Sequence, residues 1–415
     1  MIKKLIFFFV FTVIYLLALY INQKIIWAIY FILLLFLIFS RHKIVYKPLF
    51  PLTILLIPLI WTALLSTGYE IYNNAQGLFY LSVPIIMITI GYQISKILTF
   101  RQILIYLVYT GTFLSLVYIS IVLVKVGFVA FLAPYEEARF VVGSGSPASI
   151  LSLIITGYSS QYGHRIFRNN VEKYVFIFVN ILAIYLFASR TYWVILIIFL
   201  FLFNMKYIKK YQIMIFTTFC ALLLVLIIFP YRFTGDITTT KSLVYKMIKT
   251  FSEIKFSDYK TYSDINIHYR GYEAYRAFMT YLDGNSINLL FGHGFGKTID
   301  LEESVYLAGS YRRIIPWIHN GYFFLLLKAG ALGLIGLVIF FINIFRIGYR
   351  NLEKDNTENR FMSLIIIGCV LSLILTNYVI CSMFTIEMAI FMITIGIILQ
   401  LFYVKNTECC QMKAE

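Results

Sequence analysis

The sequence predicts an all-α polytopic membrane protein with about twelve transmembrane helices and one large, partly helical outer loop. Two observations predict this fold class. Hydrophobic residues make up 61% of the 415 positions and charged residues only 13%, a composition far outside that of soluble domains. In addition, apolar runs long enough to cross the roughly 30 Å hydrocarbon core of a bilayer recur along nearly the whole chain.

The expected spans follow one another with short connections, except for one long polar interruption. They cover about 4–20, 25–40, 49–66, 77–95, 102–124, 146–162, 174–188, 192–205, 212–229, 320–345, 361–378 and 382–404. The sixth run contains small and polar residues and the eighth is short. Lys3 and Lys4 precede the first run as they would in a signal peptide, but no small-x-small cleavage site follows, so we expect a retained helix.

The distribution of positive charge predicts the orientation. With an even number of spans and both termini cytoplasmic, the inner loops collect most of the lysines and arginines, among them Lys43, Arg168, Lys209 and Lys354. The short outer loops hold only Lys24, Lys125, Arg139 and Arg190. This is the positive-inside pattern. The formal charge of +16 therefore reflects topology, and we expect no nucleic-acid partner.

The chain divides into three parts: helices in 1–229, a large outer loop in 230–318, and helices followed by a cytoplasmic tail in 319–415. Within the loop, the apolar spacing over 241–256 predicts a helix lying on the membrane or on neighbouring helices. A second helix is expected from Arg270 to Leu282, ended by Asp283-Gly284-Asn285. The loop has no cysteine, so no disulfide can hold it and its order must come from packing.

Several common functions lack their motifs. There is no G-x-x-x-x-G-K-[ST] sequence, which leaves an ATP-driven pump unsupported. The glycines at 292, 294 and 296 do not make a dinucleotide fingerprint, because Lys297 stands where a glycine is needed. No Asp-x-Asp and no metal-ligand spacing occurs either. We therefore expect chemistry without a metal and without a cofactor.

Arginines dominate the polar chemistry expected on the outer side. Arg190 lies in the tight turn Ala188-Ser189-Arg190-Thr191, and Arg270 begins the second loop helix. The planar guanidinium group makes bidentate, charge-assisted hydrogen bonds that suit a diphosphate. Further cations of the same loop are Arg276, Arg312 and Arg313. The alternative for each is a solvated charge or a phospholipid contact.

The sequence Pro316-Trp317-Ile318-His319-Asn320-Gly321 stands where the polar loop enters an apolar run. His319 could accept a proton near neutral pH, and Asn320 beside it is a candidate for binding substrate. For His268 and His293 we expect structural roles. Lys328 and Glu387 are ionisable residues inside apolar runs and are functional candidates, or they pair with each other or with helix carbonyls.

These residues together resemble the O-antigen polymerase and O-antigen ligase family. The resemblance is carried by Ser189-Arg190 at a helix boundary, by an Arg-led helix at Arg270 and by the Gly292-x-Gly-x-Gly turn. It is also carried by His319-Asn320 followed by Leu325-Leu326-Leu327 and the glycines at 330, 333 and 336. It extends to the topology of the whole chain, with a long outer loop between late helices. Its most specific part is the His-Asn-Gly sequence with its trailing glycines.

The resemblance implies a metal-independent, inverting glycosyltransferase of the GT-C type in the bacterial inner (cytoplasmic) membrane. Donor and acceptor would be undecaprenyl-diphosphate-linked oligosaccharides, and a chain-length regulator protein would be a partner. Arg190 and Arg270 match the arginines that bind the diphosphate, and His319 matches the histidine that activates or positions the acceptor. Arg276, Arg312 and Arg313 match no motif and enter as electrostatic candidates. The leading interpretation is a polymerase of repeat units for O-antigen, capsule or exopolysaccharide. The alternatives are a ligase that moves finished glycan to a lipid acceptor, and a flippase or transporter of the lipid-linked unit.

Overall fold

The computed structural model describes residues 46–128, 142–143, 145–204, 253–307, 310–352 and 356–412, with isolated positions at 25, 28, 29, 31, 32, 35 and 130. The expected spans at 4–20 and 212–229, most of 25–40 and most of the expected loop helix at 241–256 lie outside these residues. The described part is mostly helical, in agreement with the predicted class.

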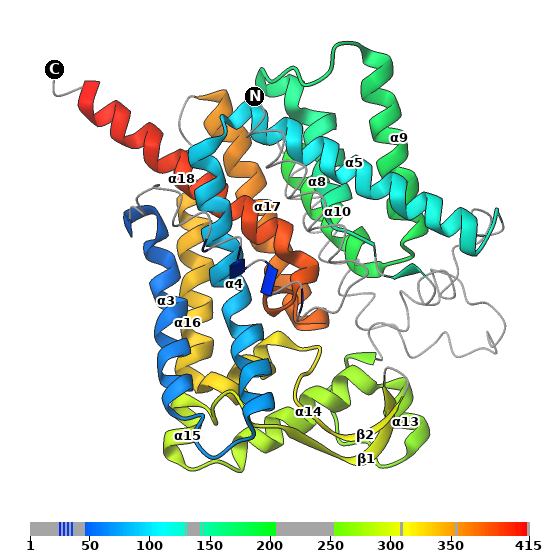
Figure 1. Cartoon of the computed structure of the whole chain (residues 1–415), viewed down its shortest axis with the longest axis vertical. Helices are drawn as coiled ribbons and strands as arrows, with labels where there is room; N and C mark the ends of the chain where they lie inside the picture. The colour runs from blue at the N-terminus through cyan, green and yellow to red at the C-terminus, as the bar shows by residue number, and fades with distance from the viewer. Residues whose placement is uncertain are drawn as a thin grey trace, which may run out of the picture.

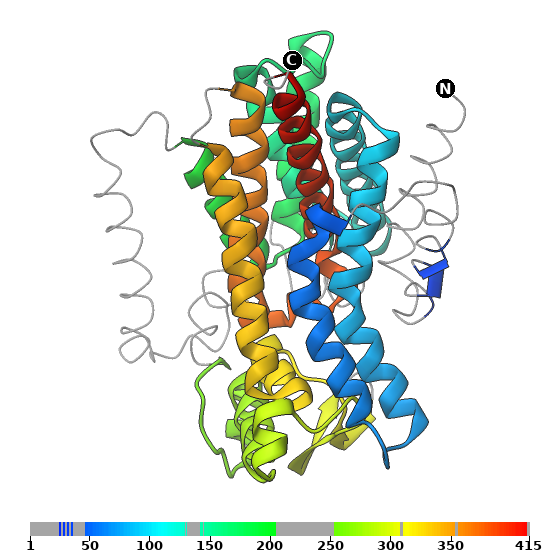
Figure 2. The same cartoon turned by 90° about the vertical axis from the view of Figure 1, so that its left-hand side faces the viewer.

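The helices form two groups (Figure 1). The first contains α3 (Tyr46–Leu64), α4 (Ile71–Ile97), α16 (Gly321–Leu352), α17 (Thr357–Ile380) and α18 (Ala389–Met412). The second contains α5 (Phe100–Lys125), α8 (Ala148–Tyr158), α9 (Asn170–Leu186) and α10 (Arg190–Asn204). In the first group α4 packs on α18, and α16 packs on both α3 and α17; α10 joins the groups by packing on α17. Figure 2 shows α3, α4 and α16 side by side.

Five helical segments among the described residues are long and apolar enough to cross a membrane: Ile71–Ile97, Phe100–Lys125, Gly321–Leu352, Thr357–Ile380 and Ile386–Thr407. The last of these joins the one-turn helix η3 (Ile386–Met388) to α18. Two shorter apolar helices cover Leu49–Leu64 and Arg190–Asn204. A mostly helical fold with helices long and apolar enough to span a membrane is thus confirmed, and the count of about twelve spans stays a prediction. The expected span at 146–162 is an 11-residue helix, α8, followed by the 3-10 turn η1 (Ser159–Tyr162). At 1.5 Å per residue, α8 is too short to cross the hydrocarbon core by itself.

Small residues allow the helices of the first group to approach closely. A Cβ atom on Gly91 of α4 would lie 1.9 Å from the carbonyl oxygen of Ile393. A Cβ on Gly396 of α18 would lie 1.9 Å from the carbonyl oxygen of Ile88. Because lipid supplies no hydrophobic force between helices, such close contact is what holds membrane helices together.

A buried polar cluster fixes the register of the second group. The side-chain amide of Asn180 on α9 donates to the hydroxyl oxygens of Thr112 on α5 (2.9 Å) and Ser152 on α8 (3.2 Å). Ser115 on α5 donates to the amide oxygen of Asn180 at 2.9 Å. Hydrogen bonds between helices are favourable where no water competes for the same groups, so this cluster specifies how α5, α8 and α9 meet.

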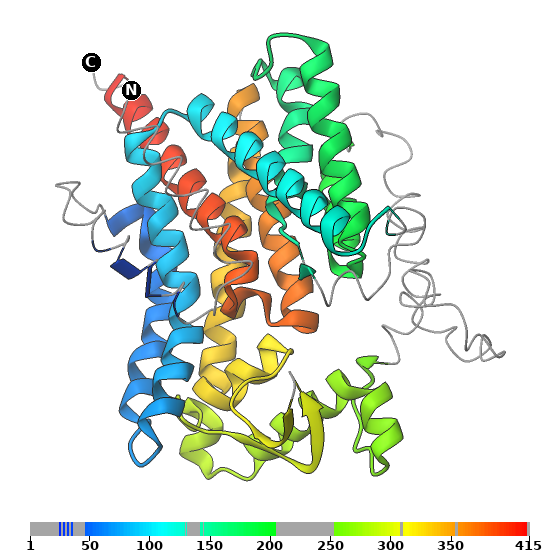
Figure 3. The same ribbon diagram turned by 45° about the vertical axis from the view of Figure 1, so that its right-hand side comes forward.

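Residues 253–320 form a layer beneath one end of the bundle, which we call the loop end (Figures 1 and 3). It contains α13 (Tyr262–Ile267), α14 (Tyr269–Leu282), α15 (Ser286–Phe291) and the antiparallel strands β1 (Ile299–Leu307) and β2 (Ser310–Ile315). The helix expected from Arg270 to Leu282 is confirmed as α14, and Asp283 ends it. The hairpin was not predicted. Its buried positions Ile299, Leu301 and Val305 stand among charged residues, which hide the strand pattern.

The run expected to be one helix over 320–345 is broken at Gly330, which corrects the prediction. Gly330 has φ 71° and ψ −173°, a conformation open almost only to glycine. The break leaves the carbonyl groups of the first half without helical partners. Those of Leu327 and Lys328 accept hydrogen bonds from the backbone amides of His293 (3.0 Å) and Gly294 (3.1 Å). The Trp61 indole donates to the carbonyl of Ala329 at 3.2 Å.

The Gly292–Gly296 turn is therefore the structural partner of the broken helix. A Cβ on Gly292 would lie 2.2 Å from the Lys328 carbonyl oxygen, and a Cβ on Gly330 would lie 2.3 Å from that of Leu290. Irregular backbone within an apolar helix is tolerated here because it is packed in protein and its polar groups are paired. The turn fixes where the first half of α16 points, and with it His319.

Candidate functional site

His319 lies at the loop end, two residues before α16, and contacts a carboxylate that the sequence reasoning did not single out. The Nδ1 atom of His319 is 2.8 Å from Oε2 of Glu273 on α14, and 3.2 Å from Oε1. The backbone amide of His319 also donates to Oε2, at 3.2 Å. The Glu273 side chain is 2% exposed and that of His319 is 31% exposed. One buried carboxylate thus holds the partly exposed His319 at two points, the imidazole Nδ1 and the backbone amide.

Aromatic side chains surround this pair. Tyr269, one helical turn before Glu273, donates a hydrogen bond to the Glu273 carboxylate, and burial together with that carboxylate raises the pKa of Tyr269 well above 10. The Tyr269 phenol therefore stays protonated as a donor. Its ring meets the His319 ring edge-on at 6.2 Å, and the Trp317 ring lies 4.8 Å from the imidazole on another side.

This geometry has a direct chemical consequence. A carboxylate accepts hydrogen bonds and cannot donate one, so a neutral His319 places its proton on Nδ1. The lone pair of the neutral imidazole is then on Nε2, the nitrogen that does not face Glu273. A histidine held in this way by a carboxylate is the arrangement that general-base catalysis uses.

Asn320 has a structural task that its sequence context did not reveal. Its side-chain oxygen accepts from the backbone amides of Tyr322 (3.0 Å) and Phe323 (3.2 Å), and the residue is only 4% exposed. This is an N-cap, which satisfies amide groups that the first turn of a helix leaves unpaired. Asn320, and not His319, caps α16. A substrate-binding role for Asn320 stays a prediction, although its side-chain oxygen is already engaged.

The start of the described loop connects Arg190 to the helical turn that contains Arg270. Arg190, the first residue of α10, forms a 2.9 Å ion pair with Glu253. Two residues further on, Lys255 contacts α14 at Gly271. A Cβ atom on Gly271 would lie 2.0 Å from the Lys255 carbonyl oxygen. Two residues span at most about 7 Å. The segment 253–255 therefore links Arg190 to the turn of α14 that carries Arg270.

The other loop arginines serve the hairpin. Arg276 on α14 donates to the carbonyl oxygen of Asp300 (3.1 Å) and pairs with Glu302 at 2.7 Å. Arg313 on β2 makes two hydrogen bonds to the carboxylate of Asp300, at 2.8 and 2.9 Å, and these lower the pKa of Asp300. Arg312 donates to the Ser310 hydroxyl at 3.0 Å. Substrate binding by Arg276, Arg312 and Arg313 stays a prediction, and the structure gives each of them a local partner.

The two ionisable residues in apolar runs do not pair with each other. The ammonium group of Lys328 donates to the carbonyl oxygens of Phe295 (2.7 Å) and Lys297, so it ties α16 to the glycine turn. Glu387 accepts from the Tyr192 hydroxyl at 3.2 Å. His293 is buried with Nε2 3.3 Å from the Tyr281 carbonyl oxygen, and His268 stacks on Tyr259 at 4.5 Å. These contacts agree with the structural roles expected for both histidines.

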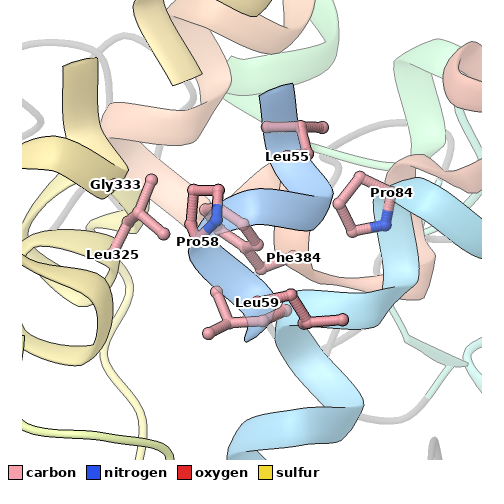
Figure 4. A pocket seen from close by; sticks show the side chains of 8 residues that line it. Leu55, Pro58, Leu59, Pro84, Leu325, Gly333 and Phe384 are labelled. Carbon is pink, nitrogen blue, oxygen red and sulfur yellow. The ribbon is translucent and has the colours of Figure 1, made fainter. Parts of the chain in front are cut away.

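Two apolar hollows adjoin the broken helix. The smaller, of about 20 Å³, is lined by Leu55, Pro58, Leu59, Leu81, Pro84, Leu325, Gly333 and Phe384 (Figure 4). It has room for about one water and its lining side chains are all apolar, so it is a packing defect between proline-containing helices and not a substrate site. The larger, of about 260 Å³, is an open groove lined by Tyr322, Val338, Phe341, Ile342, Phe345, Arg346 and Ile374. Tyr322, at the site end of this groove, is three residues from His319.

No protein-family model matches this chain, and no curated protein sequence matches it significantly. The resemblance to the polymerase and ligase family therefore rests on the short motifs and on the expected topology. Sequence reasoning missed Glu273, because the residue types around it do not show that its position is buried. It stands between Tyr272 and Ala274, which are buried with it in α14, and a buried carboxylate needs a partner.

Proposed function

We propose that the protein is a membrane glycosyltransferase that polymerises lipid-linked oligosaccharide repeat units. The observation that carries the proposal is the contact of His319 with the buried Glu273 carboxylate, just before the broken helix α16. In addition, Arg190 is linked through residues 253–255 to the turn of α14 that contains Arg270. Such a site brings a proton acceptor and cations to the membrane surface, where a lipid anchor and a water-soluble sugar meet.

The proposed reaction is a single displacement at the anomeric carbon of the donor. The bond from this carbon to the diphosphate oxygen breaks, and a bond to an acceptor hydroxyl oxygen forms. The hydroxyl proton passes to Nε2 of His319. The electron pair of the broken bond leaves with the diphosphate, whose growing negative charge Arg190 and Arg270 stabilise. In the donor complex, the diphosphate replaces the Glu253 carboxylate on Arg190. No nucleotide is needed, because the donor is already activated.

The apolar groove beside Tyr322 supports a lipid-linked donor. It lies on the membrane helices α16 and α17 and is lined almost entirely by hydrocarbon side chains. An isoprenoid tail placed there would have its diphosphate near the start of α16, which is the end that carries His319. The proposal places this end on the outer face of the bacterial inner membrane. The end of α4, the starts of α5 and α9, and the end of α18 lie at the opposite end of the bundle (Figure 1). Lys96, Arg101, Arg168 and Lys405 belong to or adjoin these parts of the chain, as the positive-inside rule requires for the cytoplasmic side.

One observation favours the transporter alternative. Broken helices line substrate paths in many transporters, and α16 is broken at Gly330. Here, however, the carbonyl groups at the break bond to Trp61 and to the glycine turn, and the break lies beside α15 at the loop end (Figure 1). A ligase would use the same site chemistry as a polymerase with a different acceptor.

The direct test is transfer by purified protein given lipid-diphosphate-linked repeat units, with chelator present. Wild type should form products of two or more units, and His319→Gln should lose on the order of a hundredfold or more in rate while it still binds donor. Glutamine can still donate to Glu273, so the variant should fold. His268→Gln is the matched control, because His268 stacks on Tyr259 and has no part in the proposed reaction. Near-normal transfer by folded His319→Gln would remove His319 from the reaction.

The surface glycan of a deletion strain separates the three functions. Loss of a polymerase leaves acceptor that bears one repeat unit. Loss of a ligase leaves undecorated acceptor and accumulated lipid-linked polymer, and loss of a flippase leaves neither. Orientation is tested by single cysteines at Asp258 and Tyr306, which should react with an impermeant reagent in intact cells. Reaction only after cell disruption would place the loop on the wrong face for the proposed donor.

A further inference from the structure

Glu273 is the carboxylate that contacts His319, the proposed proton acceptor. It is buried, so it is not a solvated surface charge. Its neighbours Tyr272 and Ala274 are also buried. Its helix is fixed by the Tyr272 hydroxyl, which donates to the Leu301 carbonyl oxygen, and by the close contact of Gly271 with Lys255. The carboxylate therefore has little freedom to move.

The carboxylate is surrounded by donors that come from two separate elements. The main-chain amide and Nδ1 of His319 approach it from the entry to α16, and the Tyr269 hydroxyl approaches it from the preceding turn of α14. Holding both the amide and the ring nitrogen of one residue restrains the ring orientation as well as its position. A buried carboxylate with this many partners satisfies its hydrogen-bonding capacity.

We propose that Glu273 is the positioning residue of the site: it fixes the Nδ1–H form of His319 and aims Nε2 at the acceptor hydroxyl, with Tyr269 holding Glu273 in place. This inference rests on the proposed function, because it assigns Nε2 as the atom that takes the acceptor proton. When that proton arrives, the imidazolium that forms lies 2.8 Å from a carboxylate, which stabilises its charge. Glu273 itself touches no substrate.

The alternative is that the pair only joins the loop layer to α16. Two measurements separate the alternatives. The first is the nitrogen spectrum of protein labelled with ¹⁵N-histidine, which is feasible because the chain has only 5 histidines; the His319 signals are assigned by their loss in His319→Gln. At a pH where the imidazole is neutral, His319 should show a protonated Nδ1 and an unprotonated Nε2. In Glu273→Gln this preference should be lost, because the glutamine amide can also donate to Nδ1.

The second measurement is kinetic. Glu273→Gln should lower kcat by at least about tenfold, as expected when the proton acceptor loses its fixed tautomer, with KM for the lipid-linked donor unchanged. Tyr269→Phe should act in the same direction and more weakly. Glu358→Gln is the matched control, since Glu358 pairs with Lys405 at the opposite end of the bundle at 3.0 Å. A purely structural link would instead lower the amount of folded protein and leave kcat per folded molecule unchanged.

An Nε2–H form of His319 in the wild-type spectrum would overturn the proposal without any variant, so the test stands even where Glu273→Gln fails to fold. Unchanged kcat in folded Glu273→Gln would overturn it as well. If His319→Gln transferred at the normal rate while the wild-type spectrum still showed the Nδ1–H form, the proposed reaction would fail and the tautomer assignment would stand. The two failures are therefore distinguishable.

Discussion

The break in α16 gives the sharpest test of the fold, through Gly330→Ala. At φ 71° and ψ −173°, an alanine pays a backbone strain of about 1–3 kcal/mol. Its Cβ would also lie 2.3 Å from the Leu290 carbonyl oxygen and 2.4 Å from the Gly292 amide nitrogen. Both atoms belong to the backbone and cannot rotate away, which adds about 1–3 kcal/mol. The expected loss is therefore about 2–6 kcal/mol.

Two other glycines separate the contributions. Gly163 has φ 83° and open space around it, so Gly163→Ala carries strain without overlap and should cost about 1–2 kcal/mol. Gly157 lies within α8 with no neighbouring atom within 4 Å of the added carbon. Gly157→Ala should be neutral or stabilising, by up to about 1 kcal/mol, because alanine favours a helix over glycine.

The measurement is thermal melting in detergent micelles, followed as the fraction of protein that remains monodisperse on size exclusion. The expected order of melting temperatures is Gly157→Ala at or above wild type, then Gly163→Ala, then Gly330→Ala far below. Transfer activity of Gly330→Ala should fall as well, since the break directs the helix that follows His319. A Gly330→Ala protein that melts like Gly157→Ala would show that α16 is not broken at this residue.

Further predictions concern the polar residues around the site. Arg270→Ala should abolish chain extension, and Arg270→Lys should restore little of it, because an ammonium group cannot make bidentate bonds to a diphosphate. Arg190→Ala should also abolish chain extension. Wild-type glycan length in both alanine variants, at normal protein levels, would show that Arg190 and Arg270 are ordinary surface charges. Asn320→Ala should cost about 1 kcal/mol of stability through the lost cap, visible as a lower melting temperature, and an unchanged melting temperature would contradict the capping role. Arg313 lowers the pKa of Asp300 below 3.8, so the pair contributes stability above that pH and loses it as pH falls through the lowered pKa. The melting difference between wild type and Arg313→Ala should therefore be present at pH 7 and shrink towards pH 3, and a difference that grows on acidification would refute it.

Several features of the structure followed from local sequence. Apolar runs predicted the helices that became α3, α4, α5 and α17, because a segment that must satisfy its backbone within lipid has few alternatives to a helix. The helix predicted from Arg270 to Leu282, with Asp283-Gly284-Asn285 as its stop signal, matches both ends of α14 to within one residue. His319 was singled out by its place between a polar loop and an apolar run.

The broken helix and the hairpin were not predictable in this way. Gly330 stands in an apolar run with other glycines, and only the approach of Gly292 from a distant turn makes it the one where the helix breaks. The hairpin residues Ile299 and Ile315 are paired through the sheet register, whereas the charged residues between them mask the alternation expected of a strand.

The sequence by itself determined the class of the protein, a bundle of apolar helices with a polar layer at one end, because burial of hydrocarbon and internal pairing of backbone groups are properties of each segment alone. It also supplied His319 and the arginines as candidates, since their chemistry is visible in the residue types. The tertiary structure alone decided their partners. Glu273 is 46 residues from His319 in the chain, and Arg190 is 63 residues from Glu253. Such pairs form only when separate helices pack, so which cation or imidazole meets which carboxylate is a property of the folded molecule.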